Sequence, residues 1–155
     1  VFWSAHPTFL SQKEMLFSGD WPGSLQRSLE SLIGPGVTVM FANGAQVWVY
    51  DLKEDPRRLR LIMSEEQVRQ VTFVSGNVTD LPALQAALAK FEITHVIHLA
   101  GLQVPTCRAN PILGAQVNVV GTLCVFEAVR LAGSAIQRLV YASTAAVFGN
   151  EFYAG

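Results

Sequence analysis

The chain has 155 residues, of which 50% are hydrophobic and 15% are charged, so we expect one sizeable core rather than two domains. Its formal net charge of -1 argues against a nucleic acid or an acidic membrane as partner. The two cysteines have neither metal-site nor disulfide spacing, no apolar run is long enough to span a bilayer, and the start lacks a signal-peptide pattern; together these predict a cytoplasmic globular protein.

Residues 1–36 differ in character from the rest. They are rich in Gly, Pro and Trp and have no sustained periodicity, which predicts loops plus one short helix around Ser24 to Leu32. We therefore treat 1–36 as an atypical N-terminal segment and 37–155 as a separate, regular unit.

The regular part opens on an apolar run. Val47 to Tyr50 predicts a strand that ends in Asp51. Asn43-Gly44 before it is either a hairpin turn that joins Val37–Phe41 to this strand or the end of a helix.

Two helices and a strand are expected next. Between residues 56 and 70, helical spacing relates Leu59, Ile62, Met63 and Val68. The β-branched run VTFVSG then predicts a strand closed by Gly76. Thr79 or Asp80 can cap a second helix with Pro82 in its first turn, and its apolar stripe is Leu84, Leu88 and Phe91.

The last third repeats the alternation. His95 to Leu99 predicts a buried strand that ends in Ala100-Gly101. A long helix follows over Ile112 to Leu131 and ends at Gly133; the side chains available for burial are Val117, Val120, Leu123, Val125 and Phe126. Leu139 to Ala142 is the final expected strand.

Strands that alternate with helices and carry few charges predict an α/β fold with a parallel sheet covered on both faces. Ligands bind such sheets beyond the carboxyl ends of the strands. The informative residues are those that follow each apolar run, namely Asp51, Gly76-Asn77-Val78, Ala100-Gly101-Leu102 and Ser143-Thr144.

Several of these residues have both a binding and a structural interpretation. Asp51 suits the two hydroxyls of a ribose and would repel a 2′-phosphate, which favours NAD over NADP; equally, it can cap the next segment. Arg57 and Arg58 either weaken the exclusion of NADP or lie on the solvent face of a helix. Gly76 and Gly101 allow close approach of a nucleotide to the backbone or simply mark strand exits.

Four polar residues remain. His98 is expected to be a core histidine satisfied by a neighbour. Asn118, an amide inside an apolar helix, needs partners if buried and would hold a loop or a catalytic water. Ser143 and Thr144 can stabilise charge on a substrate oxygen or cap a helix, and no nucleophile motif surrounds them.

Four motifs, VSGNVTD, VIHLAG, VNVVGTLCVFEAVR and LVYASTAAVFG, occur in an order and spacing that resemble the extended short-chain dehydrogenase/reductases. The resemblance is to their NAD-dependent epimerase/dehydratase group, which includes UDP-galactose 4-epimerase, and covers about Ala45 to Gly149. It implies a Rossmann-like doubly wound sheet, here incomplete, with residues 37–155 as a partial NAD-binding domain.

The resemblance also implies residue roles. Asp51 would hold the adenosine ribose, and Asn77 and Val78 would border the adenine. The dinucleotide would be lined by Leu99, Ala100, Gly101 and Gln103. Asn118 matches the family's helix asparagine near the active site, Thr144 the hydroxyl residue that assists a catalytic tyrosine, and Ser143 lies beside it. No metal is implied.

Three departures from the family pattern stand out. Asn77 replaces the usual aspartate and loses a charge-assisted bond. Nothing before Val37 matches the glycine-rich turn that places a pyrophosphate on a helix N-terminus. No Tyr-x-x-x-Lys pair follows Thr144, and Tyr153 lacks the lysine.

The first hypothesis is therefore part of an NAD-dependent epimerase, dehydratase or reductase for a nucleotide sugar or a similar alcohol or ketone, inactive alone. The alternative is a non-catalytic dinucleotide-binding regulatory protein. A structural piece that pairs with another chain is a third. An incomplete sheet exposes an apolar edge, so homo-oligomers or self-association are expected.

Overall fold

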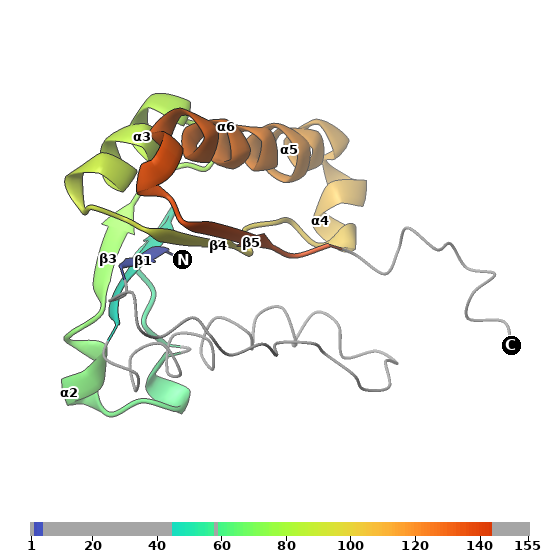
Figure 1. Ribbon diagram of the computed structural model, residues 1–155. Coiled ribbons are helices and arrows are strands. Elements are labelled where there is room, and N and C mark those ends of the chain that lie inside the picture. Colours follow the sequence, from blue (N-terminus) through green and yellow to red (C-terminus); the bar gives the residue numbers. More distant parts are fainter. Residues whose placement is uncertain (1, 5–44, 58, 144–155) are drawn as a thin grey trace, which may run out of the picture.

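The computed structural model describes residues 2–4, 45–57 and 59–143, which form a five-stranded sheet with helices on both faces (Figure 1). The order across the sheet is β3-β2-β1-β4-β5. The strands are β1 (Phe2–Ser4), β2 (Gln46–Asp51), β3 (Thr72–Ser75), β4 (His95–His98) and β5 (Arg138–Tyr141). The predicted Rossmann-like architecture is confirmed, and the expectations for 5–44, including the helix near Ser24, lie outside the described residues.

The centre of the sheet differs from a wholly parallel arrangement. The pairs β2–β3 and β4–β5 are parallel, as expected from the helical crossovers, but β1 runs antiparallel to both β2 and β4. Three residues are too few to carry a period-2 pattern, so this strand could not be predicted within a segment expected to be loops. The atypical first strand of the predicted fold is therefore an inverted central strand.

One face of the sheet is covered by α3 (Leu81–Lys90) and α6 (Thr122–Ala132). Asp80 caps α3 by accepting a hydrogen bond from the backbone N–H of Ala83 at 3.0 Å, with proline in the first turn. The core on this face is formed by Tyr50, Leu84, Ala87, Leu88, Ile93, Val96, Val125 and Ala128. The predicted cap and apolar stripe are thus confirmed, with Phe91 half-buried beside Trp48.

The opposite face is covered by two short helices rather than the single one that the spacing predicted. These are η2 (Leu59–Leu61) and α2 (Glu65–Val68). The break comes at Ser64, whose hydroxyl accepts from the backbone N–H of Gln67 while the Gln67 side chain accepts from the Ser64 N–H, a capping box that starts a new helix. Burial follows the predicted spacing at Leu59, Met63 and Val68, but Ile62 is exposed.

The expected long helix is a series of segments with one buried face. It consists of α5 (Pro111–Ala115), the π-helix η3 (Gln116–Gly121) and α6, and the short η4 (Gly133–Ala135) follows it. A separate helix, α4 (Val104–Ala109), precedes it. Gly133 ends α6 with φ +60°, as predicted. Val125 packs on α3, whereas Val120 and Leu123, which were expected to be available for burial, are exposed.

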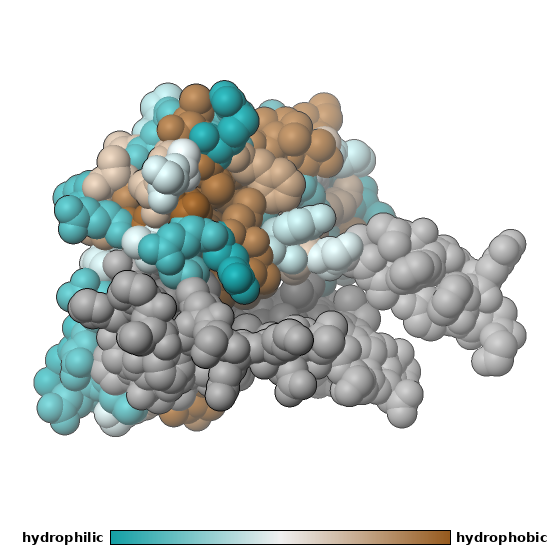
Figure 2. Space-filling model, viewed as in Figure 1, coloured by the Kyte–Doolittle hydropathy of each residue, from teal (hydrophilic) through white to brown (hydrophobic). Residues whose placement is uncertain are grey.

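The outer face of these helices is strongly apolar (Figure 2). Its exposed side chains include Ile112, Leu113, Val119, Val120, Leu123 and Leu131. By length and composition the stretch Pro111–Ala135 could cross a membrane, so the expectation that no run is long enough was wrong. Core helices of soluble proteins pass the same test, and this one packs on α3, so the absence of a membrane partner stays a prediction.

Candidate functional site

Four strand ends meet at one edge of the sheet. The parallel register pairs Asp51 with Ser75 and His98 with Tyr141, so β2, β3, β4 and β5 all finish at the same edge. The segments that follow them therefore converge there, as the topology of parallel strands requires.

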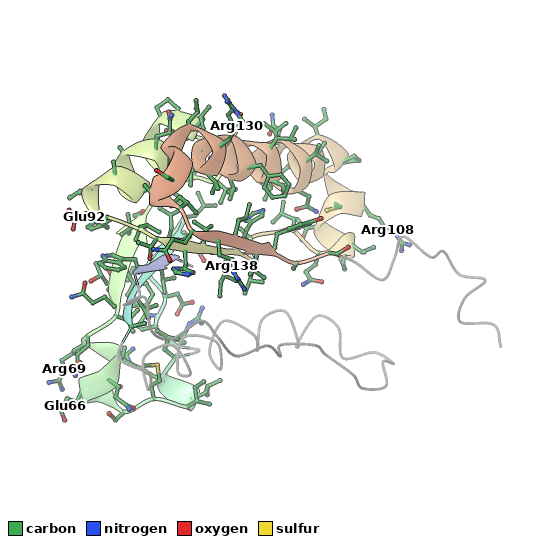
Figure 3. The ribbon with its side chains drawn as sticks, in the orientation of Figure 1. Glu66, Arg69, Glu92, Arg108, Arg130 and Arg138 are labelled. Atoms are coloured by element: carbon green, nitrogen blue, oxygen red, sulfur yellow. The ribbon has the colours of Figure 1, made fainter. Side chains whose placement is uncertain are left out.

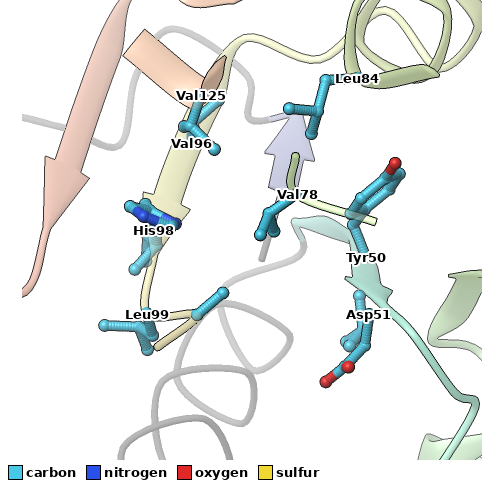
Figure 4. Close-up of a pocket in the computed structure, with 11 residues that line it drawn as sticks. Tyr50, Asp51, Val78, Leu84, Val96, His98, Leu99 and Val125 are labelled. Atoms are coloured by element: carbon cyan, nitrogen blue, oxygen red, sulfur yellow. The ribbon is translucent and has the colours of Figure 1, made fainter. Parts of the chain in front are cut away.

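A small cavity lies at this edge, between β2 and β4. The register of β1 reaches only Trp48 on β2 and Val96 on β4, so the described part of β1 stops short of the carboxyl halves of both strands. The cavity, of about 60 Å³, lies in this position and is lined by Val49, Tyr50, Asp51, Val78, Leu84, Val96, Ile97, His98, Leu99, Ala100 and Val125. Figure 4 shows Tyr50 and Asp51 on one side of it and His98 and Leu99 on the other.

Asp51 presents an exposed carboxylate at the end of β2. Its Oδ1 accepts from the backbone N–H of Leu52 at 2.6 Å, and its own carbonyl accepts from the N–H of Gly76 at 2.9 Å. The carboxylate thus partly caps the next segment, as one interpretation expected, while staying open to solvent. Arg57 is exposed and bound to Asp55, and Arg58 lies outside the described residues.

Gly76 is required by a side chain of the protein itself. A Cβ atom at this position would come within 2.2 Å of Cζ of the Tyr50 ring, which is closer than any real contact. Tyr50 is buried, and its hydroxyl donates to the carbonyl of Asn77 at 3.3 Å. Sequence reasoning did not assign Tyr50, because an apolar run buried on both faces does not reveal which member lines a cavity.

Asn77 and Val78 form the exit from β3. The Oδ1 atom of Asn77 accepts from the N–H of Thr79 at 3.0 Å, an Asx-turn that leads into α3. An amide oxygen has a second lone pair, so it can still accept from a ligand. Val78 lines the cavity and packs against Gly121 of η3, where an added Cβ would lie 2.8 Å from Val78 Cγ2.

Asn118 clamps the segment that follows β4. Its Oδ1 accepts from the backbone N–H of Leu102 at 2.6 Å, and its Nδ2 donates to the carbonyl of Leu102 at 2.9 Å. Nδ2 also lies 3.5 Å from Sγ of Cys107. Asn118 lies in the π-helix η3, a kind of helical segment that is frequent at functional sites. Of the two predicted uses of this amide, holding a loop is the one observed.

The clamped segment contains the other predicted cofactor residues. Leu99 and Ala100 line the cavity, and Gln103 begins α4 without a side-chain capping bond. An added Cβ on Gly101 would meet only Asn118 Oδ1, at 3.6 Å, so nothing in the described part of the chain crowds it and this backbone is open to approach.

His98 is a buried strand histidine with a neighbour, as predicted. Thr122 donates its hydroxyl proton to the carbonyl of Asn118 at 2.8 Å, so its oxygen accepts from Nε2 of His98 at 2.9 Å. This geometry assigns the proton to Nε2. Burial lowers the pKa of His98, because desolvation penalises the charged imidazolium.

Ser143 lies just beyond β5 and is exposed. The N–H of Ala142 donates to the carbonyl of His98 at 3.1 Å, so the pairing carries β5 to the level at which β4 ends. Ser143 therefore leaves the sheet at the same edge as Leu99. Thr144 lies outside the described residues.

The adenosine half of NAD, the cofactor that the sequence resemblance implies, fits this edge. An exposed carboxylate on β2, an apolar valine after β3 and an uncrowded glycine backbone after β4 could supply contacts to a ribose, a base and a dinucleotide backbone. The enclosed volume is far below the several hundred Å³ of an ordinary ligand pocket. A dinucleotide would thus lie along the open edge, with the cavity beneath it. Within the described residues no group of three or more His, Cys, Asp or Glu could hold a metal.

The sequence of the chain is similar to those of known proteins. Residues 37–153 match the family described as GDP-mannose 4,6 dehydratase. Over 99 residues the chain is 34% identical to UDP-glucose 4-epimerase of Homo sapiens, covering 63% of this chain and 28% of that relative. Over 117 residues it is 30% identical to GDP-mannose 4,6-dehydratase sdnI of Sordaria araneosa, covering 74% and 21%.

Solved structures show the same likeness. The chain is similar to UDP-glucose 4-epimerase of Thermus thermophilus in complex with NAD, with a TM-score of 0.58 and 30% identity over 75% of this chain and 34% of that one. The chain thus spans less than a third of the two curated relatives and about a third of this structure.

Proposed function

The chain belongs to the GDP-mannose 4,6-dehydratase family of NAD-dependent epimerases and dehydratases, and on this premise we propose that it forms the dinucleotide-binding part of an enzyme for nucleotide sugars. The observation that carries the proposal is the convergence of Asp51, Asn77-Val78 and Leu99–Gly101 on one edge of the sheet, around a cavity between β2 and β4. Relatives that bind NAD and act on nucleotide sugars support it.

The adenosine end of NAD is assigned to the ends of β2 and β3. Asp51 accepts hydrogen bonds from the ribose hydroxyls through its exposed carboxylate. Asn77 accepts from the adenine amine with the remaining lone pair of Oδ1, and Val78 packs against the base.

The nicotinamide end is assigned to the segment after β4. Leu99, Ala100 and Gly101 would line the dinucleotide, and Gln103, at the start of α4, would lie close to it. Asn118 acts as a positioning residue, because both groups of its amide are used to hold Leu102. It would fix the height of this segment over the cavity.

Bound NAD would accept a hydride from the alcohol carbon of the sugar. Ser143 and Thr144 would donate hydrogen bonds to the oxygen on that carbon and orient it. The position of Ser143 at the shared edge supports this role, whereas that of Thr144 rests on the motif LVYASTAAVFG alone.

These 155 residues are predicted not to turn over substrate alone. The proton of the reacting alcohol needs a base, and the sequence contains no Tyr-x-x-x-Lys pair. The second candidate is a regulatory protein that binds the dinucleotide without chemistry. We also propose a cytoplasmic location, because both cysteines, Cys107 and Cys124, are free thiols.

Calorimetric titration with NAD tests the binding role. We expect binding that Asp51→Ala weakens about ten-fold, the loss of a hydrogen bond to a charged group. Glu66→Gln is the matched control, since this exposed carboxylate lies on α2, away from the strand ends (Figure 3). No heat of binding at millimolar NAD, or equal losses in both variants, would reject the assignment.

A turnover assay tests the predicted inactivity of these 155 residues. Incubation with NAD and UDP-galactose should give no product above background from this chain. Product formation would refute the predicted inactivity and the regulatory alternative together. NAD binding without product fits both candidates.

A further inference from the structure

The segment that links β2 to η2 is held beside the proposed ribose site. At its start, the N–H of Leu52 donates to Asp51 Oδ1 at 2.6 Å, and the hydroxyl of Ser75 donates to the Leu52 carbonyl at 3.2 Å. At its end, Leu59 is 2% exposed and anchors η2 in the core. The segment of residues 52–57 therefore starts at the carboxyl edge of the sheet and is held at both ends.

Within this segment Arg57 is held by Asp55. The Nε atom of Arg57 donates to Asp55 Oδ1 at 2.8 Å and to Oδ2 at 2.9 Å, and Nη2 donates to Oδ2 at 2.5 Å. The backbone N–H of Arg57 also donates to Oδ1, at 3.1 Å. The fork of the guanidinium is thus directed at a carboxylate only two residues away.

The chemistry at stake is the 2′ position of the adenosine ribose. NADP differs from NAD by a phosphate there, and proteins that accept it commonly present an arginine, whose planar fork matches a phosphate. Arg57 is an arginine of the segment after β2 that could serve in this way. Lys53, in the same segment, offers a point charge without that fork.

We propose that Asp55 is a selectivity residue for the cofactor: by binding the guanidinium of Arg57, it withholds this cation from the 2′ position and leaves Asp51 to select NAD. The inference rests on the proposed function of the edge. Asp55 is a positioning residue in this scheme, because it acts through Arg57 and touches no cofactor atom.

The size of the effect is limited by exposure. The side chains of Arg57 and Asp55 are 84% and 42% exposed, so solvent screens their attraction. A 2′-phosphate dianion could compete with Asp55 for Arg57 only when Asp51 no longer repels it. The contribution of Asp55 is therefore best measured in the Asp51→Ser background.

The experiment compares NAD and NADP affinities by calorimetric titration. In the Asp51→Ser background we expect Asp55→Asn to raise the NADP affinity about five-fold relative to that for NAD. Adding Arg57→Gln should abolish this gain. Glu54→Gln, which removes the same charge from the same segment without touching the partner of Arg57, should change the ratio by less than about two-fold.

Each result of these titrations supports or overturns the role of Asp55. If the gain in NADP affinity persists after Arg57→Gln, or if Glu54→Gln gives an equal gain, the effect comes from the net charge of the segment. Either result would overturn the role of Asp55. An unchanged ratio in a protein that still binds NAD would overturn it too, while leaving the proposed function intact. If the unsubstituted chain binds neither nucleotide, the proposed function fails first and the selectivity role with it.

Discussion

The clamp between Asn118 and Leu102 makes a prediction that two similar substitutions can separate. Asn118→Ala removes both hydrogen bonds, at 2.6 and 2.9 Å, and so releases both the N–H and the carbonyl of Leu102. Asn118→Asp keeps an oxygen that accepts from the Leu102 N–H but turns the other atom of the side chain from a donor into an acceptor facing a carbonyl. The two variants should therefore free different halves of the clamp.

The magnitude follows from the number of bonds lost. Each hydrogen bond contributes about 0.5–1.5 kcal/mol net, and Asn118 is exposed, so Asn118→Ala should cost local stability of about 1–2 kcal/mol. Since about 1.4 kcal/mol is a factor of ten, the amide of Leu102 should exchange with solvent about ten times faster. In Asn118→Asp at neutral pH, the same amide should keep most of its protection because the carboxylate still accepts from it.

Residue-resolved hydrogen exchange by NMR is the assay. Asn110→Ala is the control, because Asn110 Oδ1 caps α5 by accepting from the N–H of Leu113 at 3.1 Å and does not touch the clamp. It should accelerate exchange at Leu113 and leave Leu102 unaffected. The reasoning is refuted if the Leu102 amide exchanges at the same rate in Asn118→Ala as in the unsubstituted chain, or equally fast in both Asn118 variants.

Three further predictions concern packing, pH and association. Gly76→Ala should lower the free energy of unfolding by about 2–4 kcal/mol in urea titrations, because the added Cβ overlaps the Tyr50 ring. The loss should be smaller in a Tyr50→Leu background, and equal losses in both backgrounds would contradict the overlap. Burial lowers the pKa of His98, so this side chain binds a proton more readily in the unfolded chain. The free energy of unfolding should therefore be constant above about pH 6.5 and fall as the pH drops below it. His98→Gln should make this fall less steep, and an unchanged slope would exclude His98 as its source. Leu123→Glu should reduce self-association in sedimentation runs by charging the exposed face of α6, whereas Ser134→Glu in η4 should not; equal association in both would remove that face as the cause.

The strand ends were predictable because their signals are local. Asp51, Gly76 and Gly101 each end an apolar run, and parallel strands must bring such ends to one edge whatever their neighbours do. The cap at Asp80 and the stop at Gly133 are local in the same sense, since each depends on backbone groups within a few residues.

What escaped prediction depends on partners far along the chain. The inverted β1 has no pattern of its own and is defined by its pairing with strands more than forty residues away. Val120 and Leu123 were expected in the core because apolar spacing cannot say whether a second surface covers a helix. In the described part of the chain α6 is covered only where it faces α3 and the sheet. The partner of Asn118 was equally hidden, since a backbone group sixteen residues away leaves no trace in residue type.

The inverted strand has a consequence for the site itself. In the family pattern, a parallel first strand delivers its carboxyl end, and the helix that follows, to the pyrophosphate. Here β1 enters the same place in the sheet from the opposite direction, so its carboxyl end at Ser4 pairs with Gln46, at the start of β2 and away from Asp51. The adenosine contacts proposed at β2 and β3 do not depend on that direction, because these two strands form a parallel pair of their own. The proposed recognition of adenosine is therefore separable from that of the pyrophosphate. In calorimetric titrations, this chain should bind NAD more weakly than a family member with the glycine-rich turn does. The corresponding difference in affinity for 5′-AMP, which lacks the pyrophosphate, should be smaller.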